Sequence, residues 1–176
     1  MKYWKQGFYD EYQEDSVEIT EEYYNQLLAG QSAGLLIVES KKGCPILAVH
    51  QPSIKEIRAR KLNELRLYDS SEEVNQFCID NTHGWWNKAT RVGLMNSIAI
   101  EKASGRTETN IWLDNTLFVL PVEKAIDMLQ QIELYALMCY NTTQGHINAI
   151  NQLETKEEIE VYNFKTGYPG KLNFIG

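Results

Sequence analysis

The sequence lacks any hydrophobic run long enough to cross a membrane. An apolar-rich run such as Ala136–Tyr140 is far shorter than the roughly 20 residues that a spanning helix needs. The first residues, Met-Lys-Tyr-Trp-Lys-Gln, lead into acidic residues without the apolar core of a signal peptide. We therefore expect a soluble, cytoplasmic protein with no membrane partner.

The sequence also lacks a basic surplus. Its net charge is −7, whereas nucleic-acid binding draws most of its affinity from Lys and Arg contacts to phosphate. Acidic residues interrupt the one basic cluster, as on the solvated side of a helix. The cluster comprises Lys55, Arg58, Arg60, Lys61 and Arg66, with Glu56 and Glu64 between them. The composition therefore predicts no nucleic-acid partner.

Cysteine is scarce, and no CxxC pair occurs among Cys44, Cys78 and Cys139. A zinc site could in principle combine Cys78, His83, Cys139 and His146. Their spacings, Cys-x4-His and Cys-x6-His, are wider than the close ligand pairs typical of zinc sites. Buried thiols and surface imidazoles are the favoured interpretation, so we expect no metal and no cofactor.

The common motifs of catalysis and nucleotide binding are missing as well. The sequence has no GxSxG, GxxxxGK[ST] or GxGxxG pattern. Cys44 precedes Pro45 in an expected strand, and only Lys42 is near enough to lower the pKa of its thiol. The sequence therefore predicts a non-enzyme, and a hydrolase with an unfamiliar Cys/His site is the least favoured alternative.

The residues that are present predict an α+β fold in two parts, divided near Pro52. Residues 1–52 form a small helix-plus-hairpin module. Thr20 is the expected N-cap of a helix over residues 21–29 that ends at Gly30. Two apolar runs, residues 35–39 and 44–49, then form a hairpin.

Residues 53–176 are expected to form a mainly α-helical domain with one β-hairpin. Helical periodicity and capping signals predict helices over residues 54–68, 88–102, 122–141 and 144–153, and a short helix capped by Thr155 and Glu158. Asp114-Asn115 between two apolar runs predicts the hairpin over residues 109–120. The composition of residues 80–84 indicates a loop, and residues 168–174 are expected to be irregular or a single edge strand.

Trp85 and Trp86 are the strongest candidates for a binding site. They follow the Gly84 loop and lie near Arg91 in the sequence, and Trp and Arg are enriched at protein–protein hot spots. Strand geometry would turn the two rings to opposite faces, with Trp85 outward because it adjoins the loop. The alternative is that both rings close the core of the helical domain. The candidate partner-binding residues are therefore Trp85, Trp86 and Arg91.

Two stretches resemble phage proteins. Residues 19–34, with the Leu35-Leu-Ile-Val and Gly43-Cys-Pro-Ile-Leu runs that follow, resemble the start of phage tail-fibre assembly proteins. Residues 54–163 resemble a phage-associated domain of unknown function. The segments that carry this second resemblance are residues 86–94, 111–115, 120–125 and 146–150.

These resemblances imply a phage or prophage protein that binds a tail-fibre protein in the host cytoplasm and assists its folding or assembly. A permanent structural or adaptor role in the virion tail is the alternative. The sequence does not specify the oligomeric state.

Overall fold

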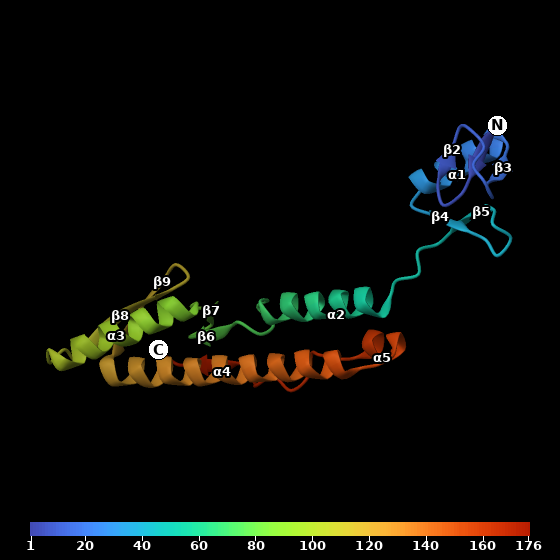
Figure 1. Ribbon diagram of the computed structural model, residues 1–176. Coiled ribbons are helices and arrows are strands. Elements are labelled where there is room, and N and C mark those ends of the chain that lie inside the picture. The colour runs from blue at the N-terminus through green and yellow to red at the C-terminus, as the bar shows by residue number, and fades with distance from the viewer. The chain divides into compact units, whose positions relative to one another are not determined.

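The computed structural model describes residues 1–176 and shows two compact units, Met1–Ser53 and Ile54–Gly176 (Figure 1). The division falls one residue after the expected boundary. Both units contain helices and strands, so the predicted α+β class is confirmed.

The N-terminal unit joins a three-stranded antiparallel sheet to a helix and a hairpin. Its elements are β1 (Lys2–Trp4), β2 (Phe8–Tyr9), β3 (Val17–Ile19), α1 (Glu21–Ser32), β4 (Leu36–Glu39) and β5 (Pro45–Ala48). Strand β1 lies between β2 and β3, and Trp4, Ile19 and Leu27 are buried. The helix and the hairpin were expected, and the three-stranded sheet adds to them.

Helix α1 begins as predicted but does not end at Gly30. The Thr20 hydroxyl accepts a hydrogen bond from the backbone N–H of Tyr23. The helix continues to Ser32, and Gly34 then takes the left-handed conformation with φ +93°. A Cβ at Gly30 would lie 2.3 Å from Cδ1 of Leu47. The glycine therefore permits close packing of β5 on the helix and is not a cap.

The C-terminal unit is built along one long helix, α4 (Val122–Gln152), whose 31 residues span about 45 Å. Helix α3 (Lys88–Ala103) runs antiparallel to its N-terminal half, as the Lys102–Glu123 and Arg91–Glu133 ion pairs show. Helix α2 (Ile54–Asp69) packs along its C-terminal half and against the short α5 (Lys156–Val161) (Figure 1). None of the helices combines the length and hydrophobicity of a bilayer span.

The expected break between residues 141 and 144 is wrong, because α4 is continuous there. Thr143 is buried, and its hydroxyl donates a 2.6 Å hydrogen bond to the Asp69 carboxylate at the end of α2. At the end of α4, the Arg58 guanidinium donates to the Ile150 and Leu153 carbonyls. Packing on α2 therefore stabilises a segment whose local sequence favours a turn.

The C-terminal unit contains two hairpins, not the single one expected. Strands β8 (Glu108–Leu113) and β9 (Thr116–Pro121) form the predicted hairpin, and Asp114 in its turn has φ 51°. Strands β6 (Phe77–Ile79) and β7 (Thr82–Gly84) form the second hairpin, whose turn and second strand occupy the residues 80–84 that were expected to be a loop. Asp80 and Asn81 make its tight turn with φ values of 44° and 68°. Strand β10 (Leu172–Phe174) pairs parallel with β6 at the edge of this sheet.

Candidate functional site

Trp86 is part of the core and is not a surface anchor. Its side chain is 6% exposed, and its ring centroid lies 4.8 Å from that of Phe77. Its indole Nε1 donates a 3.0 Å hydrogen bond to the backbone carbonyl of Trp112. The prediction that Trp86 contacts a partner is therefore wrong for the folded protein, because the ring fills the space under the β8–β9 hairpin.

Arg91 is also internal, with 7% exposure. Its Nε donates to Oε2 of Glu133 at 2.6 Å, and its Nη1 donates to the Trp86 carbonyl at 2.7 Å. Its guanidinium carbon lies 5.1 Å from the centre of the Trp85 ring, a cation–π distance. These contacts use the guanidinium to join α3 to α4, so Arg91 supports the fold and is not an exposed contact residue.

Trp85 is half-buried beside the same core. Its ring contacts Arg91, and it also packs near Phe77 and Tyr135, at centroid distances of 6.2 and 6.0 Å. The two adjacent tryptophans therefore do enter one core, contrary to the expectation that strand geometry would separate them. They follow the end of β7 and do not lie on the strand. The three predicted residues come together, but as a structural cluster.

The outer face of the β8–β9 hairpin is an exposed apolar surface of the C-terminal unit. Trp112 is 60% exposed and pairs across the strands with Leu117, which is also exposed. Val119, the next outward residue of β9, pairs with Asn110. The alternate residues Ile111, Leu113, Phe118 and Leu120 are buried. We define the outer hairpin face as Trp112, Leu117 and Val119.

Sequence reasoning missed this face because both faces of the hairpin are apolar. A half-buried strand usually shows alternating apolar and polar residues, which identifies its outer positions. The runs Ile-Trp-Leu and Leu-Phe-Val-Leu show no such alternation. The signal was nevertheless available: in a two-stranded hairpin with one buried face, half of a continuous apolar run must point outward.

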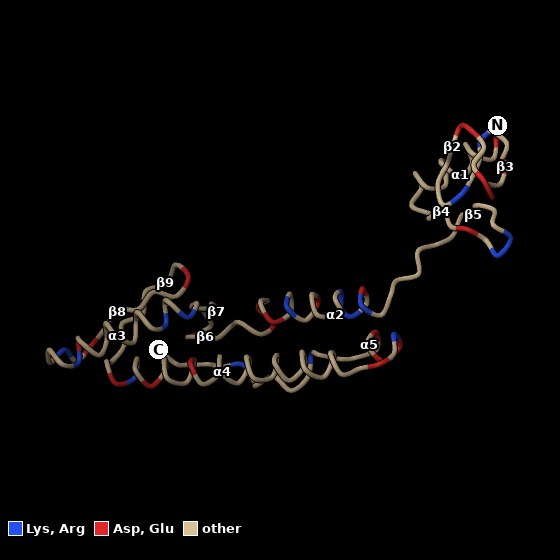
Figure 2. Tube along the Cα trace, in the orientation of Figure 1, with Lys and Arg blue, Asp and Glu red and all other residues tan.

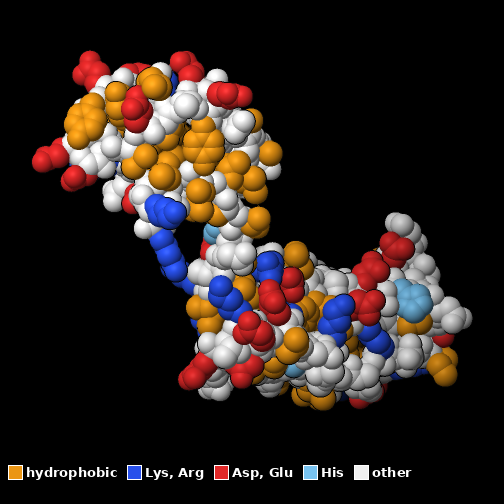
Figure 3. Space-filling model, turned by 90° about the vertical axis from the view of Figure 1, so that its right-hand side faces the viewer, with side chains coloured by type: hydrophobic (Ala, Val, Ile, Leu, Met, Phe, Trp, Pro, Cys, Tyr) orange, Lys and Arg blue, Asp and Glu red, His pale blue; other side chains and the backbone are white.

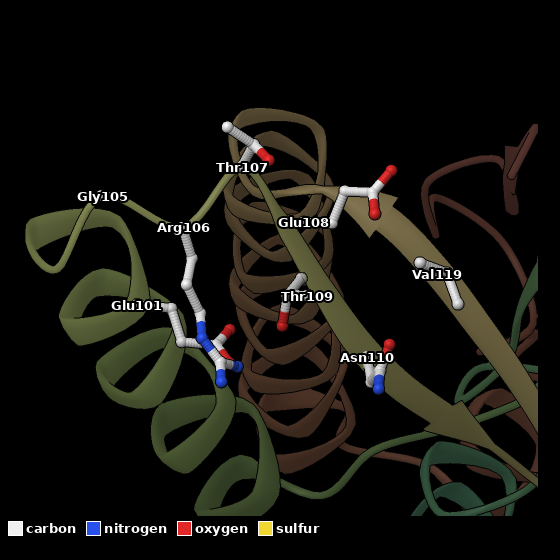
Figure 4. Close-up of a pocket in the computed structure, with 8 residues that line it drawn as sticks. All are labelled: Glu101, Gly105, Arg106, Thr107, Glu108, Thr109, Asn110 and Val119. Atoms are coloured by element: carbon white, nitrogen blue, oxygen red, sulfur yellow. The ribbon is translucent and has the colours of Figure 1, made fainter.

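A polar cavity of about 430 Å³ adjoins this hairpin (Figure 4). Arg106 extends beside Glu101, with Nη1 at 2.9 Å from Oε1 of the carboxylate. The remaining carboxylate oxygen of Glu101 is buried and has no hydrogen-bond partner. Val119 belongs to both the cavity lining and the outer hairpin face. The cavity therefore provides hydrogen-bonding groups directly beside an apolar surface.

The cysteines and histidines do not converge on one site. No group of three or more Cys, His, Asp or Glu side chains is arranged to hold a metal ion. Both ring nitrogens of His146 have partners, the Tyr162 hydroxyl and the Thr166 carbonyl, at 2.8 Å each. Burial raises the pKa of the Cys139 thiol, which favours the protonated, weakly nucleophilic form. Cys78 is buried, opposite His83 in the β6–β7 ladder.

The N-terminal unit carries further exposed hydrophobic side chains, which gather on the upper unit in Figure 3. Those at its surface are Met1, Tyr9, Tyr12, Leu36, Ile46 and Val49. Leu36 lies on β4 and Ile46 on β5. This unit therefore also presents apolar surface, but without a single exposed tryptophan at its centre.

Comparisons of the chain with family models, with curated proteins and with solved structures found no match.

Proposed function

We propose that this chain is a non-catalytic protein that binds another protein through the outer hairpin face. The observation that carries the proposal is the 60% exposure of Trp112 within a continuous apolar surface. Tryptophan is the residue type most enriched at binding hot spots, and its exposure in the free protein leaves it available to a partner. Single exposed aliphatic residues are common on protein surfaces, whereas a cross-strand Trp–Leu pair with a third apolar neighbour is not.

The edge of the hairpin suggests how a partner binds. Strand β9 pairs only with β8, so its outer edge presents main-chain N–H and C=O groups without a strand partner. Its sequence, Thr-Leu-Phe-Val-Leu-Pro, contains none of the charged residues that commonly block such edges. An extended partner segment added along β9 would place its side chains beside Leu117 and Val119.

The resemblance to phage tail-fibre assembly proteins identifies the partner that we propose, a tail-fibre protein. A fibre chain that has not yet assembled exposes strand edges and apolar surface that promote aggregation. Temporary cover by the hairpin edge would suppress that aggregation. A permanent adaptor in the virion tail is the alternative role for the same surface.

Co-expression with a phage tail-fibre protein tests the proposal. We expect the tagged chain to co-purify with the fibre and to raise the yield of soluble fibre trimer. Trp112→Ala should abolish both effects while the circular dichroism spectrum is unchanged. Leu67→Ala, at an exposed apolar position on α2, is the matched control and should retain both.

Equal co-purification of the fibre with wild type and Trp112→Ala would contradict binding through this face. A fibre that trimerises equally well without the chain would contradict the assembly role. Retention of the chain on finished fibres would favour the permanent adaptor.

A further inference from the structure

A second exposed apolar surface of the C-terminal unit lies on helices α3 and α4, which run side by side. Leu134 and Leu137 of α4 are 61% and 54% exposed, and Met138 and Val92 are exposed as well. Met95, Gln130, Glu133, Leu134 and Leu137 line an apolar depression of about 470 Å³ on it. We call this surface the α3–α4 face.

The α4 part of this surface carries no charge beyond Glu133. Glu133 is the last Asp, Glu, Lys or Arg of α4, so the 19 residues from Leu134 to Gln152 contain none. Glu133 itself is paired with Arg91. By contrast, charged residues of both signs are spaced along α2 (Figure 2). An exposed helix surface without charge is unusual in a chain with net charge −7, and loss of charge is typical of the centre of an interface.

The exposed residues of α4 follow the spacing of a helix–helix seam. The series Gln130, Leu134, Leu137, Asn141, Gln144 and Asn148 alternates steps of four and three residues. That spacing keeps side chains on one line of a helix that packs against another helix. All six are exposed in the single chain, so no helix of the same chain occupies the seam.

The chemistry of the seam favours a second copy of this chain over other occupants. Residues near a two-fold axis meet the same residues of the second copy, so any charge there would face its like. Neutral apolar and amide side chains avoid that repulsion. An amide both donates and accepts hydrogen bonds, so Gln and Asn can pair with one another across the axis.

We propose that two copies of the chain associate through the α3–α4 face, with the Leu134–Leu137 segments of the two α4 helices packed on each other across a two-fold axis. The α4 helices run antiparallel in this dimer, and Leu134 of one copy packs against Leu137 of the other. In the same register, Gln130 of one copy faces Asn141 of the other. The depression beside Met95 receives an apolar side chain of the second copy as a knob in a hole.

The size of the face sets the expected affinity. A single antiparallel helix pair along the roughly 27 Å seam from Gln130 to Asn148 buries less surface than the roughly 1,200–2,000 Å² of a stable interface. The dimer should therefore dissociate on dilution.

Light scattering coupled to size-exclusion chromatography tests this proposal on the full chain. We expect the mass of wild type to double between micromolar and near-millimolar concentrations. Leu137→Lys and Leu134→Glu should each stay monomeric, because either one places charge in the apolar centre. Leu67→Lys, which adds the same charge at an exposed position on α2, should dimerise like wild type.

Mixing the two monomeric variants gives the sharper test. In the antiparallel register, the lysine introduced at position 137 meets the carboxylate introduced at position 134 of the other copy, so the mixture should regain dimer mass. A wild type that remains monomeric, variants that still dimerise, or a mixture that stays monomeric would each overturn the proposal. Circular dichroism verifies that the variants are folded, and the charge-reversed pair, Leu137→Glu with Leu134→Lys, replaces a pair in which either variant is not.

The dimer does not depend on the proposed fibre binding. Trp112→Ala lies outside the α3–α4 face and should dimerise normally, whereas Leu137→Lys should still bind the fibre. Loss of dimerisation and loss of fibre binding are therefore separately measurable.

Discussion

Trp86 and Trp112 are joined by a 3.0 Å hydrogen bond from the indole Nε1 of the first to the backbone carbonyl of the second. One ring is buried, and the other is 60% exposed. The core thus fixes the backbone of β8 at the residue whose side chain we assign to partner binding. A tryptophan predicted to contact the partner instead positions the exposed tryptophan that we propose for that role.

Trp86→Ala and Trp112→Ala should therefore differ strongly in stability. Loss of the buried Trp86 ring should lower the free energy of unfolding by about 3–5 kcal/mol, because it leaves a cavity beside Phe77. Loss of the exposed Trp112 ring should change it by less than about 0.5–1 kcal/mol. Urea unfolding followed by circular dichroism measures both. Similar destabilisation of the two variants would show that Trp112 belongs to the core and would remove the candidate binding site.

The sequence predicted most helix positions because local signals and tertiary packing agree there. Helices expected over residues 54–68 and 88–102 correspond to α2 and α3 within one residue at each end. The predicted capping box of Thr155 and Glu158 is confirmed by reciprocal hydrogen bonds. The turn expected after residue 141 does not form, because the buried hydrogen bond between Thr143 and Asp69 stabilises the helix there. The local sequence gives no sign of this long-range contact.

The candidate site was predicted less well. Trp85, Trp86 and Arg91 were predicted to contact a partner, but sequence spacing cannot show that Glu133, 42 residues away from Arg91, pairs with the buried guanidinium. The outer hairpin face was not predicted, because the continuous apolar runs of β8 and β9 do not show which residues point outward. The pairing partner of strand β10 could not be predicted for a different reason: β6 lies about a hundred residues earlier in the chain.

The Arg91–Glu133 pair should show strong energetic coupling. Glu133→Gln removes the counter-ion of a guanidinium that is 7% exposed, and since Glu133 itself is half-exposed we expect a loss of about 1–2 kcal/mol. Arg91→Met should cost more, because it also removes the bond to the Trp86 carbonyl. The double variant should be less destabilised than the sum of the two single variants. A double-mutant cycle by urea unfolding measures this coupling, and a value near zero would mean that the pair contributes nothing specific.

Gly30 and Gly93 offer a matched test of why α1 contains a glycine. Both lie inside helices, where replacement of Gly by Ala normally stabilises by up to about 1 kcal/mol. A Cβ at Gly93 meets nothing within 4 Å, so Gly93→Ala should show that gain. A Cβ at Gly30 would lie 2.3 Å from Cδ1 and 3.0 Å from Cγ of Leu47, so the whole Leu47 side chain must move. Gly30→Ala should therefore destabilise the N-terminal unit by about 1–3 kcal/mol.

Leu47→Ala supplies the control, because it removes the atoms that the new methyl group would strike. On that background Gly30→Ala should become neutral or stabilising, as it is for Gly93. Thermal unfolding of residues 1–53, followed by the near-ultraviolet signal of Trp4, reports on this unit alone. Stabilisation by Gly30→Ala in the wild-type background would show that Leu47 moves at little cost and that close approach of β5 is not the reason for the glycine.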